Sequence, residues 1–129
     1  MGHDYYKGGA EHYHSIGENL AALKSEYDYE GGYFGEQSPG HDVDKRIIAS
    51  DDPLATARDF YDTGAYGGIE RELDNGKGVR TDMADGTTFT FREVSGSPDR
   101  SPAVNISIRR SADTGGVETQ KIHFVLGGE

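Results

Sequence analysis

The chain has 129 residues, of which 13 are Lys or Arg and 23 are Asp or Glu, so its formal net charge is −10, and 33% of its residues are hydrophobic. This length allows one domain, or a small domain with an appended arm. The sequence contains no cysteine, which excludes disulfide scaffolds, thiolate zinc sites and cysteine nucleophiles. No apolar run approaches the roughly 18 residues of a membrane span. The first residues show no signal peptide, and we expect no association with a membrane.

The acidic residues are concentrated in the first half of the chain. Residues 1–65 carry five cationic and thirteen anionic side chains, a net charge of −8, whereas residues 76–123 carry seven cationic and six anionic ones, a net charge of +1. The total charge disfavours a general nucleic-acid coat, because phosphate binding needs clustered cations. It does not disfavour a small cationic site within residues 76–123.

Residues 1–49 are expected to form an acidic arm rich in glycine and tyrosine. Apolar residues from Tyr13 to Tyr27 recur at steps of three and four, which predicts a helix over 10–27. Residues 28–42 contain repeated glycines and acidic residues, and this composition is typical of a linker or a long loop. The arm either binds a partner or packs on the rest of the chain.

Residues 50–129 are expected to form an α+β domain. Ser50 or Asp51 can cap a helix over 52–63, and Pro53 is tolerated in its first turn. Beyond this helix the apolar residues alternate, which predicts four strands at 79–83, 87–94, 103–109 and 118–126. Short loops between consecutive strands favour antiparallel pairing. We therefore expect the N-terminal helices to pack on a four-stranded antiparallel sheet.

The alternation also places a set of polar residues on one face of that sheet. His123 and Lys121 share one face of the last strand, and Thr90 and Arg92 share the polar face of their own strand. An imidazole titrates near neutrality and can transfer a proton, and a guanidinium offers phosphate a planar fork. We expect His123 and Arg92 to be catalytic, with Lys121 and Thr90 binding the substrate.

These assignments have simpler alternatives. His123 could face solvent on a terminal strand without any chemical role. Arg92 could form an ion pair with Glu118 or Asp82, which contributes little when exposed. A metal site among the histidines of the first half (His3, His12, His14 and His41) is disfavoured, because residues two apart do not meet on a helix. We therefore expect no metal site.

Two serines follow the strand of Arg92. Ser95 and Ser97 lie in a loop with glycine and proline and can offer hydroxyls and amides to an anion. We expect Ser95 to be catalytic and Ser97 and Arg109 to bind substrate. The whole set suits metal-independent cleavage of RNA, in which a base removes the ribose 2′-OH proton, the oxygen attacks phosphorus and an acid protonates the leaving oxygen. This reaction requires no cofactor.

The second half of the chain carries a series of short motifs: Ala57-Arg58-Asp59-Phe60-Tyr61, Ala65-Tyr66-Gly67-Gly68, Asp85-Gly86-Thr87, Phe91-Arg92-Glu93-Val94-Ser95, Ser101-Pro102-Ala103-Val104-Asn105-Ile106 and Gln120-Lys121-Ile122-His123-Phe124-Val125. With these motifs the chain resembles the C-terminal toxin domains of bacterial polymorphic toxins of the LXG, contact-dependent inhibition and Rhs types. Those domains look like the barnase, EndoU, colicin and RelE group of ribonucleases, which place a helix before a four-stranded antiparallel sheet. The resemblance implies a toxin ribonuclease and favours Arg92, Ser95 and His123 as its site, with Lys121 in support.

The resemblance also implies a biological setting. It implies a secreted protein that acts on RNA in the cytoplasm of a target bacterium, that is neutralised by a cognate immunity protein and that is otherwise a monomer. Relatives often carry aspartate where this chain has Asn105. If that aspartate is needed for catalysis, asparagine at this position lowers activity. Because related modules include DNases, a metal-dependent DNase toxin is one alternative. A non-catalytic interaction module is another.

Overall fold

The computed structural model describes residues 5–6, 16–40, 42–73, 78–84, 86–94, 101–108 and 117–127. The helices of this part of the chain are α1 (Ile16–Glu26) and α2 (Pro53–Gly64). Its strands are β1 (Tyr5–Tyr6), β2 (Tyr29–Glu30), β3 (Tyr33–Phe34), β4 (Glu36–Gln37), β5 (Lys45–Ser50), β6 (Ile69–Glu72), β7 (Gly78–Asp82), β8 (Thr88–Arg92), β9 (Ala103–Ser107) and β10 (Thr119–Leu126). Neither helix is long and apolar enough to cross a bilayer.

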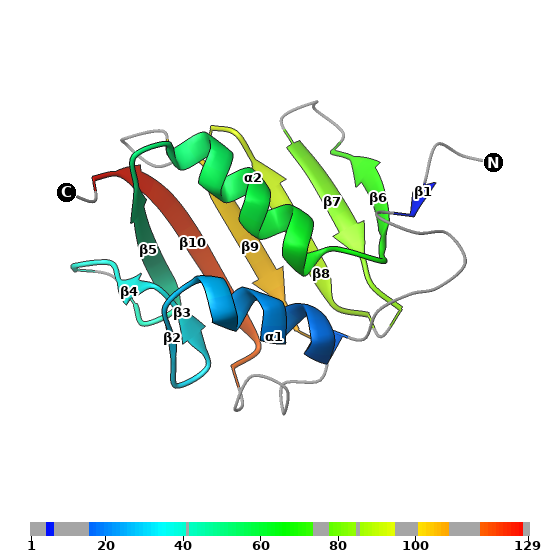
Figure 1. Cartoon of the computed structure of the whole chain (residues 1–129), viewed down its shortest axis with the longest axis horizontal. Coiled ribbons are helices and arrows are strands. Elements are labelled where there is room, and N and C mark those ends of the chain that lie inside the picture. The colour runs from blue at the N-terminus through cyan, green and yellow to red at the C-terminus, as the bar shows by residue number, and fades with distance from the viewer. Residues whose placement is uncertain are drawn as a thin grey trace.

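Eight of these strands form one mixed sheet. Their order is β1-β6-β7-β8-β9-β10-β5-β4 (Figure 1). Every neighbouring pair is antiparallel except β10 and β5, which run parallel with Lys121 opposite Lys45 and Leu126 opposite Ser50. Strands β2 and β3 pair separately as a small hairpin. The chain therefore has an α+β fold in which the last strand is not an edge strand.

The expected four-stranded antiparallel sheet with N-terminal helices packed on it is wrong. Strands β7 to β10 follow one another as predicted, but the sheet continues through β6 and β1 on one side and through β5 and β4 on the other. Strand β5 lacks an alternating apolar pattern because its buried residue is Arg46, only 8% exposed, while Ile47 and Ile48 are adjacent. Its parallel pairing with β10 also leaves no local signal, because the two strands are far apart in the sequence.

The N-terminal third of the chain contains more regular structure than its composition indicated. The expected helix over 10–27 begins at Ile16 within the described residues and ends at Glu26. The stretch 28–42, expected to be a linker or loop, contains β2, β3 and β4. The boundary drawn between residues 49 and 50 falls inside β5.

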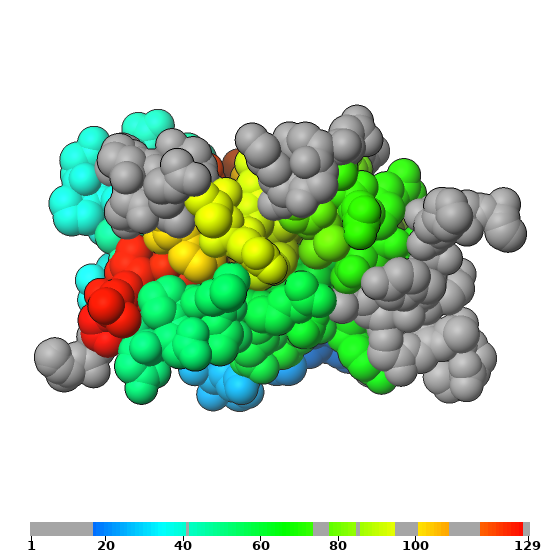
Figure 2. Space-filling model, turned by 90° about the horizontal axis from the view of Figure 1, so that it is seen from above, coloured from blue at the N-terminus to red at the C-terminus, as the bar shows by residue number. Residues whose placement is uncertain are grey.

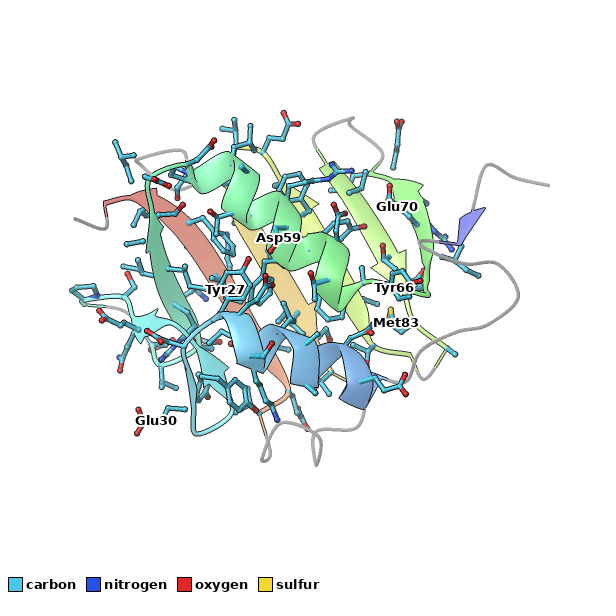
Figure 3. The ribbon with its side chains drawn as sticks, in the orientation of Figure 1. Tyr27, Glu30, Asp59, Tyr66, Glu70 and Met83 are labelled. Atoms are coloured by element: carbon cyan, nitrogen blue, oxygen red, sulfur yellow. The ribbon has the colours of Figure 1, made fainter. Side chains whose placement is uncertain are left out.

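Both helices lie on one face of the large sheet, as the views in Figures 1 and 2 show. Helix α2 begins close to its predicted position, but its cap is Asp52, whose Oδ1 accepts a hydrogen bond from Ala55 N at 3.2 Å. Pro53 occupies the first turn, where its missing N–H costs nothing. Helix α1 packs on α2, and Tyr27, just beyond its end, donates a hydrogen bond to Asp59 of α2 at 2.6 Å (Figure 3).

One apolar core fills the space between the helices and the sheet. Its fully buried members include Leu20, Leu23, Phe34, Ala57, Phe60, Phe89, Val104, Ile122 and Phe124. The ring of Phe60 contacts those of Phe34 and Phe124, with centroids 5.1 and 5.6 Å apart. Because Phe34 and the α1 leucines belong to this core, the described residues of the N-terminal region and the strands of the second half stabilise one another.

Two buried polar side chains hold the β3 region against the sheet. Gln120 of β10 accepts a hydrogen bond from Phe34 N at 2.9 Å and donates one to Gly32 O at 3.0 Å. Arg46 of β5 donates to the carbonyl oxygens of Phe34, Gly35 and Val43 at 3.1, 2.8 and 2.9 Å. These bonds satisfy polar groups that would otherwise be costly to bury.

Candidate functional site

The face of the large sheet opposite the helices, called the polar face here, carries a line of cations. Directly opposed residues on neighbouring strands point to the same side of a sheet. The pairings place six residues in one line from β6 to β5, here called the cationic row: Arg71, Arg80, Thr90, Asn105, Lys121 and Lys45. The row alternates along each strand with core residues such as Phe89, Ile106 and Ile122, so it faces away from the core.

A second line, two residues further along the strands, contains the histidine. Arg92 of β8 and His123 of β10 both lie opposite Ala103 of β9. Arg92 is exposed and His123 is half-buried. Two strand spacings separate their backbones by about 10 Å, and only the methyl group of Ala103 stands between them. The sheet therefore brings a proton-transferring group and a guanidinium to the same small area.

Ser101 holds the imidazole of His123. Its Oγ lies 3.0 Å from His123 Nδ1, and the residue is only 7% exposed. Such a contact fixes the plane of the ring. Ser101 precedes Ala103 by two residues and so reaches the same face. The sequence by itself gave this serine no role, because the register of β9 against β10 cannot be read from either strand alone.

Lys121 lies in a cationic and partly desolvated environment. Burial lowers the pKa of its amine below the usual value, and the charges of Arg92 and Lys45 lower it further. Lys45 Nζ lies 3.9 Å from Oδ1 of its neighbour Asp44. Among the described residues, Arg92 makes no ion pair. An anion placed among these three cations would therefore relieve their mutual repulsion.

The structure brings four of the seven predicted site residues to the polar face: Thr90, Arg92, Lys121 and His123. Ser95, Ser97 and Arg109 lie outside the described residues. The expected alternative for Arg92, an ion pair with Asp82, is not formed, because Asp82 pairs instead with Arg71 at 3.2 Å and Arg80 at 3.0 Å.

No metal centre is visible in the described part of the chain, where no three His, Asp or Glu side chains are grouped as ligands. His3, His12, His14 and His41 lie outside the described residues. A shallow hollow of about 430 Å³ lies on the helix side, between Asn19 and Ala22 of α1 and Asp62 near the end of α2. None of the predicted site residues lines this hollow.

Comparison with family models, with curated proteins and with solved structures finds no match to this chain.

Proposed function

We propose that this protein is a ribonuclease whose catalytic centre lies on the polar face at His123, Arg92 and Lys121. The observation that carries the proposal is the arrangement around His123: Ser101 orients its ring at 3.0 Å, while Arg92 shares its line of the sheet and Lys121 precedes it by two residues on the same face. A proton-transfer group beside two cations is what cleavage of a phosphodiester requires.

The reaction uses the ribose 2′-hydroxyl as its nucleophile. His123 Nε2 takes the 2′-OH proton, the 2′-oxygen bonds to the adjacent phosphorus, and the bond from phosphorus to the 5′-oxygen breaks. The 5′-oxygen leaves with a proton taken from water, His123 returns its proton to the solvent, and the other fragment ends in a 2′,3′-cyclic phosphate. In the tautomer with the proton on Nδ1, Ser101 Oγ accepts from Nδ1 and leaves the Nε2 lone pair to act as the base.

The cations stabilise the negative charge that develops on the phosphate oxygens. Arg92 offers a planar fork to two oxygens. Lys121 is partly desolvated, and its pKa is lowered by burial and by neighbouring cations. Its ammonium group therefore attracts an approaching anion more strongly than the ammonium group of an exposed lysine does. Thr90 adds a hydroxyl beside them, and we assign Ser95, Ser97 and Arg109 to further substrate contacts.

The biological role we propose is that of a toxin domain. It is supported by the resemblance of residues 57–125 to the C-terminal domains of polymorphic toxins. In that role the protein is secreted, enters the cytoplasm of a target bacterium and cleaves RNA there, and a cognate immunity protein protects the producing cell.

The test is cleavage of total RNA by the purified protein in EDTA, with His123→Ala beside the wild type. We expect the variant to keep its circular dichroism spectrum and to lose activity by about 10²- to 10⁴-fold, the usual contribution of a general acid or base. Arg58→Ala is the control, because Arg58 is an exposed arginine of α2 on the opposite side of the sheet.

Three results would contradict the proposal. Full activity in folded His123→Ala removes the histidine from the mechanism. Cleavage of plasmid DNA only with added Mg²⁺ identifies a metal-dependent DNase. The absence of nuclease activity, together with normal bacterial growth during induced expression, identifies a non-catalytic interaction module.

A further inference from the structure

Resting on the proposed function, we propose that Ile47 and Val125 bind one nucleobase of the RNA, that of the nucleotide whose 2′-hydroxyl attacks. This nucleotide lies lengthwise along β10, with its 3′-phosphate at Lys121, its ribose at His123 and its base at Val125. Four observations on the described residues carry the inference.

The first observation is an apolar patch beside His123 on the polar face. Ile47 of β5 lies directly opposite His123, and Ala49 of β5 lies directly opposite Val125. Directly opposed residues share a face of the sheet, as do residues two apart on one strand. Ile47 and Val125 are half-buried and Ala49 is exposed. Because the apolar core lies on the other face, core packing does not account for these three side chains, here called the apolar patch.

The second observation is that β5 and β10 change character in the same direction. The two strands are parallel neighbours (Figure 1), and each carries a lysine at the start of its polar face and an apolar side chain further along. The residues are Lys45, Ile47 and Ala49 on β5 and Lys121, His123 and Val125 on β10. The rise of four residues separates the backbones of Lys121 and Val125 by about 13 Å. A ligand that joins an anionic end to an apolar end fits this arrangement.

The third observation is the charge at the two borders of the apolar patch. Lys121 lies at one border, and Asp44 already lies 3.9 Å from the neighbouring Lys45, so Lys121 is the main phosphate contact. At another border, the exposed Glu36 of β4 lies directly opposite Ile47. A carboxylate there repels phosphate. The charges therefore give a bound nucleotide one direction, with its phosphate at the lysine and its base on the apolar patch.

The fourth observation is that the ribose presents its groups in the same order as β10. Its carbons C3′, C2′ and C1′ carry the phosphate, the attacking hydroxyl and the base. Lys121, His123 and Val125 follow one another along the polar face of β10. A ribose held at His123 therefore keeps its 2′-oxygen at the imidazole while the base covers the apolar patch. Aliphatic side chains contact the face of a base, which every base has, so we expect all four bases to be accepted.

The experiment measures the binding of small phosphates, so that it does not depend on catalysis. The four nucleoside 3′-monophosphates, and ribose 3-phosphate, which lacks a base, are titrated into methyl-labelled protein and followed by NMR. The readouts are the dissociation constants and the methyl signals of Ile47 and Val125, which the ring current of a base lying over them moves upfield.

The main variant is Ile47→Thr/Val125→Thr, which keeps the β-branched shape that suits a strand and removes apolar surface. Leu54→Thr is the matched control, because Leu54 is 44% exposed and belongs to α2, on the other side of the sheet. Lys121→Gln changes the phosphate end alone. Circular dichroism checks that each variant is folded.

We expect each nucleotide to bind the wild type about tenfold more tightly than ribose 3-phosphate, the factor gained by burying about two methylene groups. The double threonine variant should lose this preference, and Leu54→Thr should keep it. Lys121→Gln should weaken every ligand by a similar factor and leave the preference intact. In the wild type, the methyl signals of Ile47 and Val125 should move upfield with nucleotides but not with ribose 3-phosphate.

The outcomes separate this inference from the proposed function. If the wild type cleaves RNA but binds nucleotides no more tightly than ribose 3-phosphate, the base-binding patch is overturned and the ribonuclease stands. An unchanged preference in the folded double threonine variant, or methyl signals that do not move, also overturns the patch. If the nucleotides bind as expected but RNA is not cleaved, the patch stands and the catalytic proposal fails. Absence of both binding and cleavage overturns both.

Discussion

The two faces of the large sheet are built from the same strands and differ in almost every physical property. On β10, Ile122 and Phe124 point into the core and are fully buried, whereas Lys121 and His123 point to the polar face and are half-buried. The helix side gains its stability from removing apolar area from water. The polar face places like charges opposite each other, which a sheet selected only for stability would avoid.

The packed core on one face lets a small chain hold like charges close together on the other face. The alternation of a strand lets one side chain anchor the backbone while its neighbour remains available for chemistry. Rigidity on the helix side fixes the positions of Arg92, Lys121 and His123 on the other. Substitutions on the helix side should therefore lower the free energy of unfolding. Substitutions on the polar face should lower activity or shift a pKa.

The largest effect is expected on the helix side. Phe124→Ala should lower the free energy of unfolding by about 3–5 kcal/mol, because the ring is fully buried against Phe60 and its removal leaves a cavity. Urea denaturation measures this change. Val125→Ala, on the neighbouring and half-buried position, is the control and should cost less than about 1 kcal/mol. Equal costs would show that the two faces do not differ as described.

A second prediction concerns a buried polar group on the same side. Tyr61 donates a hydrogen bond to Glu70 at 3.1 Å and also bonds Thr81, so Tyr61→Phe should cost about 1–3 kcal/mol. Burial raises the pKa of Tyr61 well above its usual value of 10, and the Glu70 carboxylate adds to this. The unfolded chain ionises first as pH rises, so the folded state loses stability above about pH 10.

The measurement for Tyr61 is the free energy of unfolding between pH 7 and pH 11. The wild type should lose stability steadily above pH 10, and the phenylalanine variant should show a shallower decline. A decline of the same steepness in both proteins would contradict the assignment of this pH dependence to Tyr61.

On the polar face, Ser101→Ala should reduce kcat for RNA by about tenfold, because a lost hydrogen bond of about 1.4 kcal/mol corresponds to that factor. Ser101 is a positioning residue, so KM should change little while the pH profile of kcat shifts. Ser101→Thr restores a hydroxyl and should restore both. If the alanine variant keeps the wild-type profile, Ser101 only packs against the ring.

The smallest expected effect is a shift in the pKa of Lys121. Lys45→Gln removes one of the cations that, after burial, lower the pKa of Lys121, so that pKa should move up toward its ordinary value and the amine should stay protonated to a higher pH. NMR titration of the Lys121 side chain measures the change. Lys24→Gln is the control, because Lys24 lies over the ring of Tyr29 on another part of the molecule. A shift in both variants would indicate only a change in total charge.

The alternating pattern of the second half predicted a large share of this protein. Strands β7 to β10, helix α2 and the common face of Thr90, Arg92, Lys121 and His123 follow from local periodicity, because the pleat of a strand and the pitch of a helix fix where each side chain points. The extent of the sheet did not follow. Arg46 occupies the buried position of β5, and two of its three backbone acceptors, the carbonyls of Phe34 and Gly35, meet it only after the β3–β4 region has folded against it.

The charges of the chain divide in the same way between what is local and what is tertiary. The sequence alone determined that a chain of net charge −10 concentrates its cations in its second half and that they alternate with core residues. Only the tertiary structure decided which cations meet: the register of β8, β9 and β10 places Arg92 and His123 on either side of Ala103, and the parallel strand β5 brings Lys45 opposite Lys121. Periodicity is a local property of the backbone, whereas register and strand order depend on contacts between segments that are distant in the sequence.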